Sequence, residues 1–444
     1  MGSKIGCHNV NTSVPSIPFL NRMPQGWRRA LGAISMLWIA TALGAVLAFV
    51  TQALLARKLG PSGYGLFASS LATITIVAPL SGFGLSNYWL QVYGVEGWQA
   101  NRWLEPSLRF IILTTLISLA VVVLWSFIGA PPDARRLLLL LLPVVFGVLA
   151  VSLISSQLRL EERHQSLAWW QLITPGGRAL VALLLWLVPS ADGRVAAVGF
   201  SATSVLMAML AWPKLKTMMR GDMQLHGHGP WQPVTGPVPS MATLWSKSWA
   251  YGMEASLYPI FLSISTVLLK YLGGNAQAGI FGIALGVMMA IYLIPTTIYQ
   301  KFLSSMLHRW AVHDPEKFWR VYRHGCIGML ASGVLVGALL AATSPWLVPI
   351  IFGEKYRPVA GVLMILAVCV PVRFLSTVMC NALLNETHMR YRVLVMGIVA
   401  LLIVALDVVL IPRYHVVGAA CTTVIGEIAS LLLMYLGVRW FHAR

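Results

Sequence analysis

The stretch LLARKLGPSGYGLFA, Leu54 to Ala68, places two cations and a Gly-Pro-Ser-Gly-Tyr-Gly cluster between two long apolar runs. Because Gly and Pro interrupt helices, the stretch predicts a short turn that ends one helix and begins the next. A similar stretch, LLKYLGGNAQAGIFGIA, recurs from Leu268 to Ala284. The sequence therefore predicts the same helix-turn-helix unit twice.

The composition predicts what kind of helices these are. Of the 444 residues, 58% are hydrophobic and 10% are charged, whereas a soluble domain carries about 25% charged residues. Apolar runs of about twenty residues, long enough to cross a bilayer, recur along the chain. We therefore expect an all-α polytopic membrane protein with about twelve spans, at 31–55, 66–90, 108–129, 137–157, 168–188, 195–213, 248–269, 278–300, 325–352, 358–383, 393–411 and 416–437.

The charge pattern predicts an orientation. The chain has 32 Lys and Arg against 14 Asp and Glu, a net charge of +18. In a membrane protein such an excess marks loops kept in the cytoplasm, so we expect no nucleic-acid partner. Most of the cations fall in alternate loops, which places both termini in the cytoplasm, and residues 1–30 lack the apolar core of a signal peptide.

The repeated turn divides the chain into halves. Leu59-Gly60 aligns with Leu272-Gly273, and Gly65 aligns with Gly279, with one residue gained in the second copy. The copies join spans one and two and spans seven and eight. We therefore expect two six-helix lobes of the same topology around a central cavity, at 31–213 and 248–437, with a cytoplasmic linker at 214–247, an N-terminal segment at 1–30 and a tail at 438–444.

With these features the chain resembles the polysaccharide and O-antigen (Wzx-type) flippases of the multidrug/oligosaccharidyl-lipid/polysaccharide exporter superfamily. The resemblance rests on the opening stretch, on PLSGFGLSNYWL after it, and on three C-terminal stretches, Leu347–Ala367, Leu383–Gly397 and Val408–Ser430. It implies a two-lobed bundle in the bacterial inner membrane that moves a polyprenyl-diphosphate-linked oligosaccharide from the inner to the outer leaflet. The implied partners are that glycolipid, membrane lipid, and a glycan polymerase and glycosyltransferases of the same pathway.

Ionisable side chains at membrane depth are costly and tend to face a cavity or a partner. The expected spans hold Arg178, Arg373, Glu254, Asp407 and Glu427. Arg373 lies near the middle of span ten. Its guanidinium is suited either to a diphosphate or to an ion pair with Glu427 or Asp407, and the two interpretations carry equal weight.

The other four residues also have alternatives. Arg178 follows a Pro-Gly-Gly sequence, which favours either substrate contact or extension to the headgroups. Glu254 has no basic neighbour in sequence and is expected to face the cavity, whereas Glu427 is expected to pair with an arginine; either is a hypothesis for ion coupling or gating. Asp407 is expected near the outer end of span eleven, close to water, and is the third hypothesis for ion coupling or gating.

Other chemistry is not indicated. The sequence has no Walker A motif, and the His226-Gly-His228 segment lacks further ligands, so no cofactor, metal site or catalytic residue is expected. The leading hypothesis is a flippase that works by alternating access. The alternatives are an ion-coupled drug or metabolite antiporter on the same fold and, with less support because the outer loops are short, a membrane glycosyltransferase or polymerase.

Overall fold

The computed structural model describes residues 25–220, 223–225, 228, 232–298, 315–382 and 386–442, and these ranges contain helices and no strand. The elements are α1 (Gln25–Val77), η2 (Ala78–Leu80), α2 (Leu85–Glu96), η3 (Gly97–Trp103), α3 (Leu104–Ile128), α4 (Pro132–Leu141), α5 (Val144–Leu160), α6 (His164–Leu187), α7 (Gly193–Met219), α8 (Met241–Leu272), α9 (Asn275–Ile298), α11 (Pro315–Phe352), η5 (Glu354–Tyr356), α12 (Pro358–Leu366), α13 (Cys369–Ala382) and α14 (Glu386–His442).

Eight stretches of this chain are long and apolar enough to cross a membrane, or nine if the bent pair α12 and α13 is one span. The first stretch runs for 94 residues and the last for 52. At 1.5 Å per residue the first would measure about 140 Å, far more than the ~30 Å hydrocarbon core. Both fold back: α1 reverses at Gly60 and α14 at His415, where the backbone leaves the helical region. The predicted all-α polytopic fold is confirmed.

Three of the expected spans are broken helices. The span predicted at 66–90 is interrupted by η2 and by Gly84, which has a positive φ. The span predicted at 137–157 is divided at Pro143 into α4 and α5, and that at 358–383 bends by 40° between α12 and α13. Proline lacks a backbone N–H donor and glycine adopts non-helical conformations easily, so the helices break at these residues.

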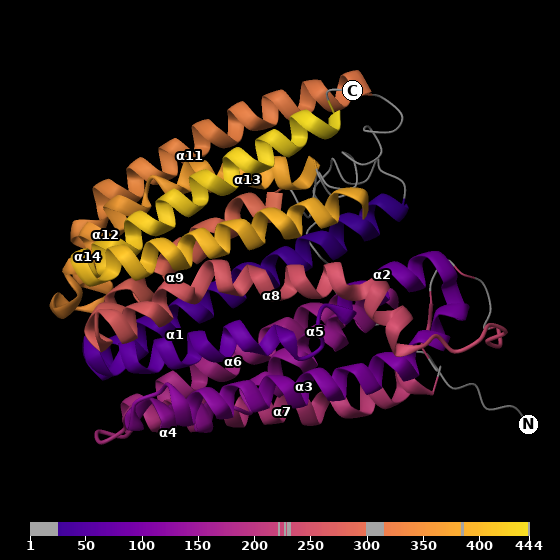
Figure 1. Cartoon of the computed structure of the whole chain (residues 1–444), viewed down its shortest axis with the longest axis horizontal. Helices are drawn as coiled ribbons and strands as arrows, with labels where there is room; N and C mark the ends of the chain where they lie inside the picture. Colours follow the sequence, from indigo (N-terminus) through magenta and orange to yellow (C-terminus); the bar gives the residue numbers. More distant parts are fainter. Residues whose placement is uncertain are drawn as a thin grey trace, which may run out of the picture.

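Both glycine turns form as expected, with a shift of one residue in their alignment. Gly60 has φ 68° and Gly274 has φ 91°, a left-handed conformation that a side chain would disfavour. Gly60 therefore corresponds to Gly274 and not to Gly273. We call the end of the bundle that holds both turns the glycine-turn end (left in Figure 1), and the opposite end, where residues 232–240 lie, the linker end.

The two turns pack against each other at glycines. A Cβ on Gly65 would overlap the carbonyl oxygen of Asn275 and lie 2.7 Å from the nitrogen of Gly279. A Cβ on Gly279 would overlap the carbonyl oxygen of Pro61 and lie 3.1 Å from the Cα of Gly65. The same sequence offset separates Pro61 from Asn275 and Gly65 from Gly279, so the contact has the reciprocal form of a two-fold interface. Only glycine permits so close an approach of the two backbones.

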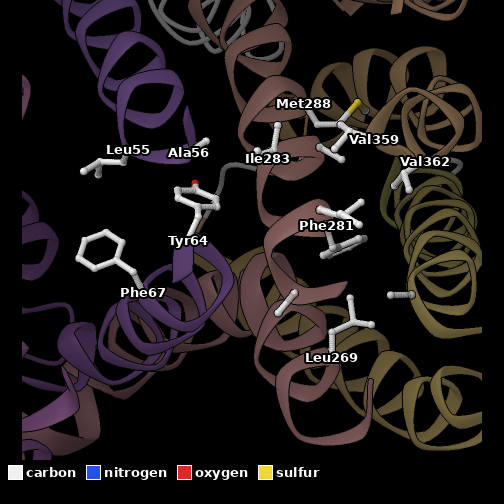
Figure 2. Close-up of a cluster of buried hydrophobic side chains, with 14 of the residues drawn as sticks. Leu55, Ala56, Tyr64, Phe67, Leu269, Phe281, Ile283, Met288, Val359 and Val362 are labelled. Atoms are coloured by element: carbon white, nitrogen blue, oxygen red, sulfur yellow. The ribbon is translucent and has the colours of Figure 1, made fainter. Parts of the chain in front are cut away.

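The largest buried cluster surrounds this contact. Figure 2 shows Tyr64 and Phe67 of α1 near Phe281 and Ile283 of α9, and all four belong to one cluster of buried side chains. The cluster continues to Val359 of α12. At this end the core therefore joins the first half of the chain to the second.

The two cations of the opening stretch cap helices. Arg57 donates from Nε to the carbonyl of Ile351 at 2.7 Å and from Nη2 to that of Ile350, in the last turn of α11. Lys58 donates from Nζ to the carbonyl of Val188, after α6, at 3.0 Å. Cations at helix C-termini satisfy free carbonyls and oppose the helix dipole. Arg57 thus ties α1 to the second half of the chain and Lys58 ties it to the first.

Helices of the two halves occupy different sides of the bundle, with α1, α8 and α9 between them (Figure 1). Part of the segment that connects the halves is docked: the side chain of Gln99 in η3 donates to the carbonyl of Pro233 at 3.0 Å and accepts from the backbone of Thr235 at 2.9 Å. Residues 1–24 of the expected N-terminal segment and 443–444 of the expected tail lie outside the described residues. The expected domain boundaries stay a prediction.

Candidate substrate cavity

A cavity of about 550 Å³, here called the central cavity, lies between the two halves of the chain. Both limbs of α1, together with α6, α7, α8 and α9, form its walls. Its lining is mostly apolar, with hydroxyl and amide groups from Thr51, Gln52, Thr174 and Ser263. Among the described residues that line it, the one charged side chain is Arg178.

Arg178 lies on the cavity wall in α6, one turn after Pro175. Its Cζ is 4.9 Å from the ring centre of Phe200, so the guanidinium rests on an aromatic face. No described carboxylate pairs with it, and its buried Nε has no hydrogen-bond partner. The sequence left substrate contact and extension to the headgroups as alternatives, and the structure places Arg178 on the wall of the cavity. The central cavity therefore presents a cation without a protein counter-ion.

A second cavity of about 350 Å³, here called the C-half cavity, lies mainly among α8, α13 and α14. Two ion pairs stand at it. Arg373 Nη1 lies 3.5 Å from Glu427 Oε1, and Arg392 Nη2 lies 2.5 Å from Glu254 Oε1. All four side chains are at most 21% exposed. Buried pairs of this kind hold three helices in one arrangement, since each charge depends on the other.

Arg373 has the densest surroundings of the five expected site residues. Its Nη2 donates to the hydroxyl of Tyr258 at 2.9 Å. Its Cζ lies 5.7 Å from the ring centre of Tyr258, 5.8 Å from that of Phe261 and 5.2 Å from that of Tyr292. The sequence left a diphosphate and an internal ion pair as alternatives, and this structure has the ion pair, with Glu427 and not with Asp407.

Glu254 has no basic neighbour in sequence, but it has a basic partner in space, Arg392. Arg392 falls just before the span expected at 393–411, but α14 begins at Glu386, so Arg392 lies inside the helix with its side chain 14% exposed. The pairing brings together residues 138 positions apart, which no local sequence pattern encodes. Glu254 lines the C-half cavity, together with Arg392, and not the central cavity that the sequence predicted it to face.

The expectation that Asp407 lies close to water is also wrong. Its relative exposure is 0%, and neither carboxylate oxygen has a hydrogen-bond partner within the described structure. The reason is that α14 continues as helix to His415, which places Asp407 two turns inside. Ser265 of α8 and Thr422 of the returning limb are the polar side chains beside it.

Tyr258 connects the two cavities and was not singled out by the sequence. It lines both the central cavity and the C-half cavity, and its hydroxyl accepts the hydrogen bond from Arg373. The following residue, Pro259, lines the central cavity as well. A tyrosine directly before a proline within an apolar span was the available signal, because proline weakens a helix at that point.

A family profile decides the wider assignment. The profile described as "Polysaccharide biosynthesis protein" matches residues 31–303, which is more than half of the chain. The chain belongs to the polysaccharide biosynthesis protein family. The match begins within α1 and ends after α9, so it includes both glycine turns and all the helices around the central cavity. The expected resemblance to a family of polysaccharide biosynthesis is confirmed.

Solved structures of a flippase and of transporters have a fold similar to that of this chain. A lipid II flippase, MurJ, in an inward closed conformation is similar with a TM-score of 0.65 at 16% identity, covering 91% of this chain and 87% of that chain. An inward-facing multidrug resistance MATE transporter of the MOP superfamily has a TM-score of 0.68 at 16% identity, with coverages of 92% and 97%. A MOP superfamily transporter from Pyrococcus furiosus has 0.59 at 16%, with coverages of 92% and 95%.

These likenesses show the fold. No curated protein sequence matches the chain. The structures named above are a flippase and two transporters, and the long apolar helices of this chain agree with a multi-pass membrane protein. What the cavity carries must be argued from its own residues.

Proposed function

We propose that this protein is a flippase that moves a polyprenyl-diphosphate-linked oligosaccharide across the membrane by alternating access of the central cavity. The family is one of polysaccharide biosynthesis, and a lipid II flippase is among the proteins of similar fold. Both support a glycan carried on a lipid, a substrate with an anionic linkage, a polar sugar chain and an apolar tail.

The observation that carries the proposal is the unpaired Arg178. A cation in a largely apolar cavity is costly unless an anion accompanies it. The diphosphate of the glycolipid supplies that anion, and the planar guanidinium forms paired hydrogen bonds with phosphate oxygens. The hydroxyl and amide groups of Thr51, Gln52 and Ser263 on the same wall suit sugar hydroxyls.

Tyr258 extends this role to Arg373. It lies at the boundary of the two cavities and already accepts a hydrogen bond from Arg373. In the proposal, a diphosphate in the central cavity competes for that guanidinium and loosens the ion pair with Glu427. Protonation or ion binding at Glu427, Glu254 or Asp407 then couples transport to an ion gradient.

Contacts at the glycine-turn end support the alternation. Tyr356 of η5 donates its hydroxyl to the carbonyl of Ala56 at 2.9 Å, and Arg57 caps α11 nearby. Both contacts join the first half of the chain to the second. They must separate for the cavity to open at this end, which in the proposed orientation is the outer side of a bacterial inner membrane, with both chain ends and the linker in the cytoplasm.

Deletion of the gene in its native host tests the substrate class. A flippase predicts accumulation of undecaprenyl-linked oligosaccharide and loss of the surface glycan, both restored by the wild-type chain. An antiporter on the same fold predicts normal glycan with altered drug or metabolite tolerance. A glycan polymerase predicts export of single repeat units. The products of neighbouring glycosyltransferases identify the glycan, and the polymerase of the pathway is the proposed next partner.

A further inference from the structure

A third cavity of about 560 Å³, here called the vestibule, lies at the linker end between the two halves of the chain. Its walls come from α2 in the first half and from α8 and the start of α14 in the second. None of the residues expected from the sequence to bind substrate lines it. It lies at the end opposite the glycine turns.

The vestibule carries a net positive charge. Lys247 and Arg390 line it, both are exposed, and neither forms an ion pair with a described residue. Glu96 also lines it, but its Oε2 already accepts from Arg102 Nη2 at 3.0 Å and from Trp103 Nε1 at 3.0 Å. The carboxylate is therefore neutralised by its own neighbours, and the two cations remain for a ligand.

A buried hydroxyl without a partner also lines the vestibule. Tyr88 is 2% exposed, and its hydroxyl has no hydrogen-bond partner in the described structure. A buried polar group in this state is costly unless something bonds to it. Close by, the Tyr251 hydroxyl donates to Gln91 Oε1 at 2.5 Å, which leaves the amide nitrogen of Gln91 to donate to a ligand. The site thus offers uncharged hydrogen-bonding groups beside its two cations.

We propose that the vestibule is a reception site for a phosphate-linked sugar headgroup. Lys247 and Arg390 bind the phosphate oxygens, because cations form the strongest hydrogen bonds to such groups. The ring of Trp249, against which Arg390 rests at 5.9 Å, provides an apolar face for a sugar ring. Tyr88 and Gln91 bond to sugar hydroxyls. This inference rests on the proposed function and adds a second site to it.

One face of α8 links the vestibule to the other cavities. Side chains that line the three cavities recur along this helix every three or four positions, as on one helical face: Tyr251, Glu254, Tyr258, Leu262 and Thr266. From Tyr251 to Thr266 the rise along the helix is about 22 Å, which is more than half of the ~30 Å thickness of a bilayer core. This face of α8 therefore connects the vestibule, through the C-half cavity, with the cavity that Arg178 lines.

The test measures binding of a short-chain prenyl-diphosphate N-acetylglucosamine to the full chain in neutral detergent, by titration calorimetry. The variant Lys247→Gln with Arg390→Gln is compared with Lys216→Gln with Arg220→Gln. The control pair removes the same charge from exposed residues at the end of α7, at the same end of the bundle. We expect the dissociation constant to rise at least about tenfold in the first pair and to stay unchanged in the control. Tyr88→Phe should raise it by about three- to tenfold.

Equal binding by the two double variants would overturn the reception site. So would a difference that appears only when phosphatidylglycerol is added, because the cations would then serve a lipid headgroup. Transport in proteoliposomes separates this proposal from the proposed function. If the wild type moves no lipid-linked glycan, the flippase assignment fails. If it does, the variant Lys247→Gln with Arg390→Gln should show a higher half-saturating concentration at an unchanged maximal rate. Wild-type kinetics in that variant would overturn the reception site and leave the flippase assignment standing.

Discussion

The hydroxyl of Tyr258 accepts a hydrogen bond from Arg373 at 2.9 Å while its side chain lines the central cavity. Arg373 in turn faces Glu427 at 3.5 Å. A change at the wall of the central cavity can therefore reach an ion pair in the second half of the chain through one side chain. In the proposed function, this contact is where substrate binding and ion coupling meet.

Tyr258→Phe removes the hydroxyl and keeps the ring against Arg373. We expect the protein to insert normally and the transport rate to fall about tenfold, because a hydrogen bond to a charged group contributes about 1.5–3 kcal/mol. The assay is initial flipping rate in proteoliposomes. Tyr292→Phe is the control, since that ring also lies against Arg373 but the hydrogen bond from Arg373 to Tyr258 stays. Equal rates in the two variants would remove Tyr258 from the mechanism.

Gly65→Ala and Gly279→Ala should each destabilise the protein. Each new methyl group would overlap a backbone carbonyl of the opposite turn, and overpacking of this kind costs about 1–3 kcal/mol. Thermal unfolding in detergent, followed by tryptophan fluorescence, measures the effect. Gly361→Ala in α12 is the control because nothing lies within 4 Å of its Cβ. A melting temperature for Gly279→Ala no lower than that of Gly361→Ala would contradict the contact.

Arg57→Gln should loosen the glycine-turn end. Without the cap on the carbonyls of Ile350 and Ile351, the last turn of α11 loses its tie to α1. A cysteine at the buried Thr51 on the cavity wall, in a chain without its native cysteines, reports opening through its rate of labelling by an impermeant maleimide. We expect the rate to rise several-fold.

Lys58→Gln is the matched control for that experiment. It removes the same charge from the neighbouring residue, but Lys58 caps α6 within the same half of the chain. Labelling should therefore stay at the wild-type rate. If both variants label alike, the loss of charge and not the contact across the halves explains the result.

The pair of Glu254 and Arg392 should show strong coupling in a double-mutant cycle. Either single change to Gln leaves a mostly buried charge without its partner, for which we expect a loss of about 1–3 kcal/mol in stability. The double variant should lose less than the sum of the two. The same cycle on Glu105 and Arg109, which are 63% and 71% exposed, should give about 0.5 kcal/mol or less. Additive losses at Glu254 and Arg392 would refute the pairing.

Much of the fold followed from the sequence because the bilayer constrains it. The length of the apolar runs predicts the helices, and the repeated glycine turn predicts a matching pair of hairpins. In the structure the two hairpins contact each other at Gly65 and Gly279. The helix breaks at Gly84 and Pro143 were signalled by residue type but hidden within continuous apolar runs. Hydropathy averages over such breaks, so it cannot place them.

The site was less predictable because its contacts join distant residues. The sequence identified Arg373 and Glu427 as rare charges at membrane depth, and their proximity depends on the packing of α13 against the returning limb of α14. Arg392 was missed because a cation near a span end is read as a loop residue. The role of Arg57 was missed because its partners are backbone carbonyls, which carry no sequence signal.

The central claim is that Arg178 receives the diphosphate of a lipid-linked glycan in the central cavity. The direct measurement is the flipping rate of undecaprenyl-diphosphate oligosaccharide in proteoliposomes that contain the wild type, Arg178→Lys or Arg178→Gln. The account predicts transport by the wild type, partial transport by Arg178→Lys, which keeps the charge without the planar fork, and at least a tenfold loss in Arg178→Gln. A wild-type rate in Arg178→Gln would contradict it.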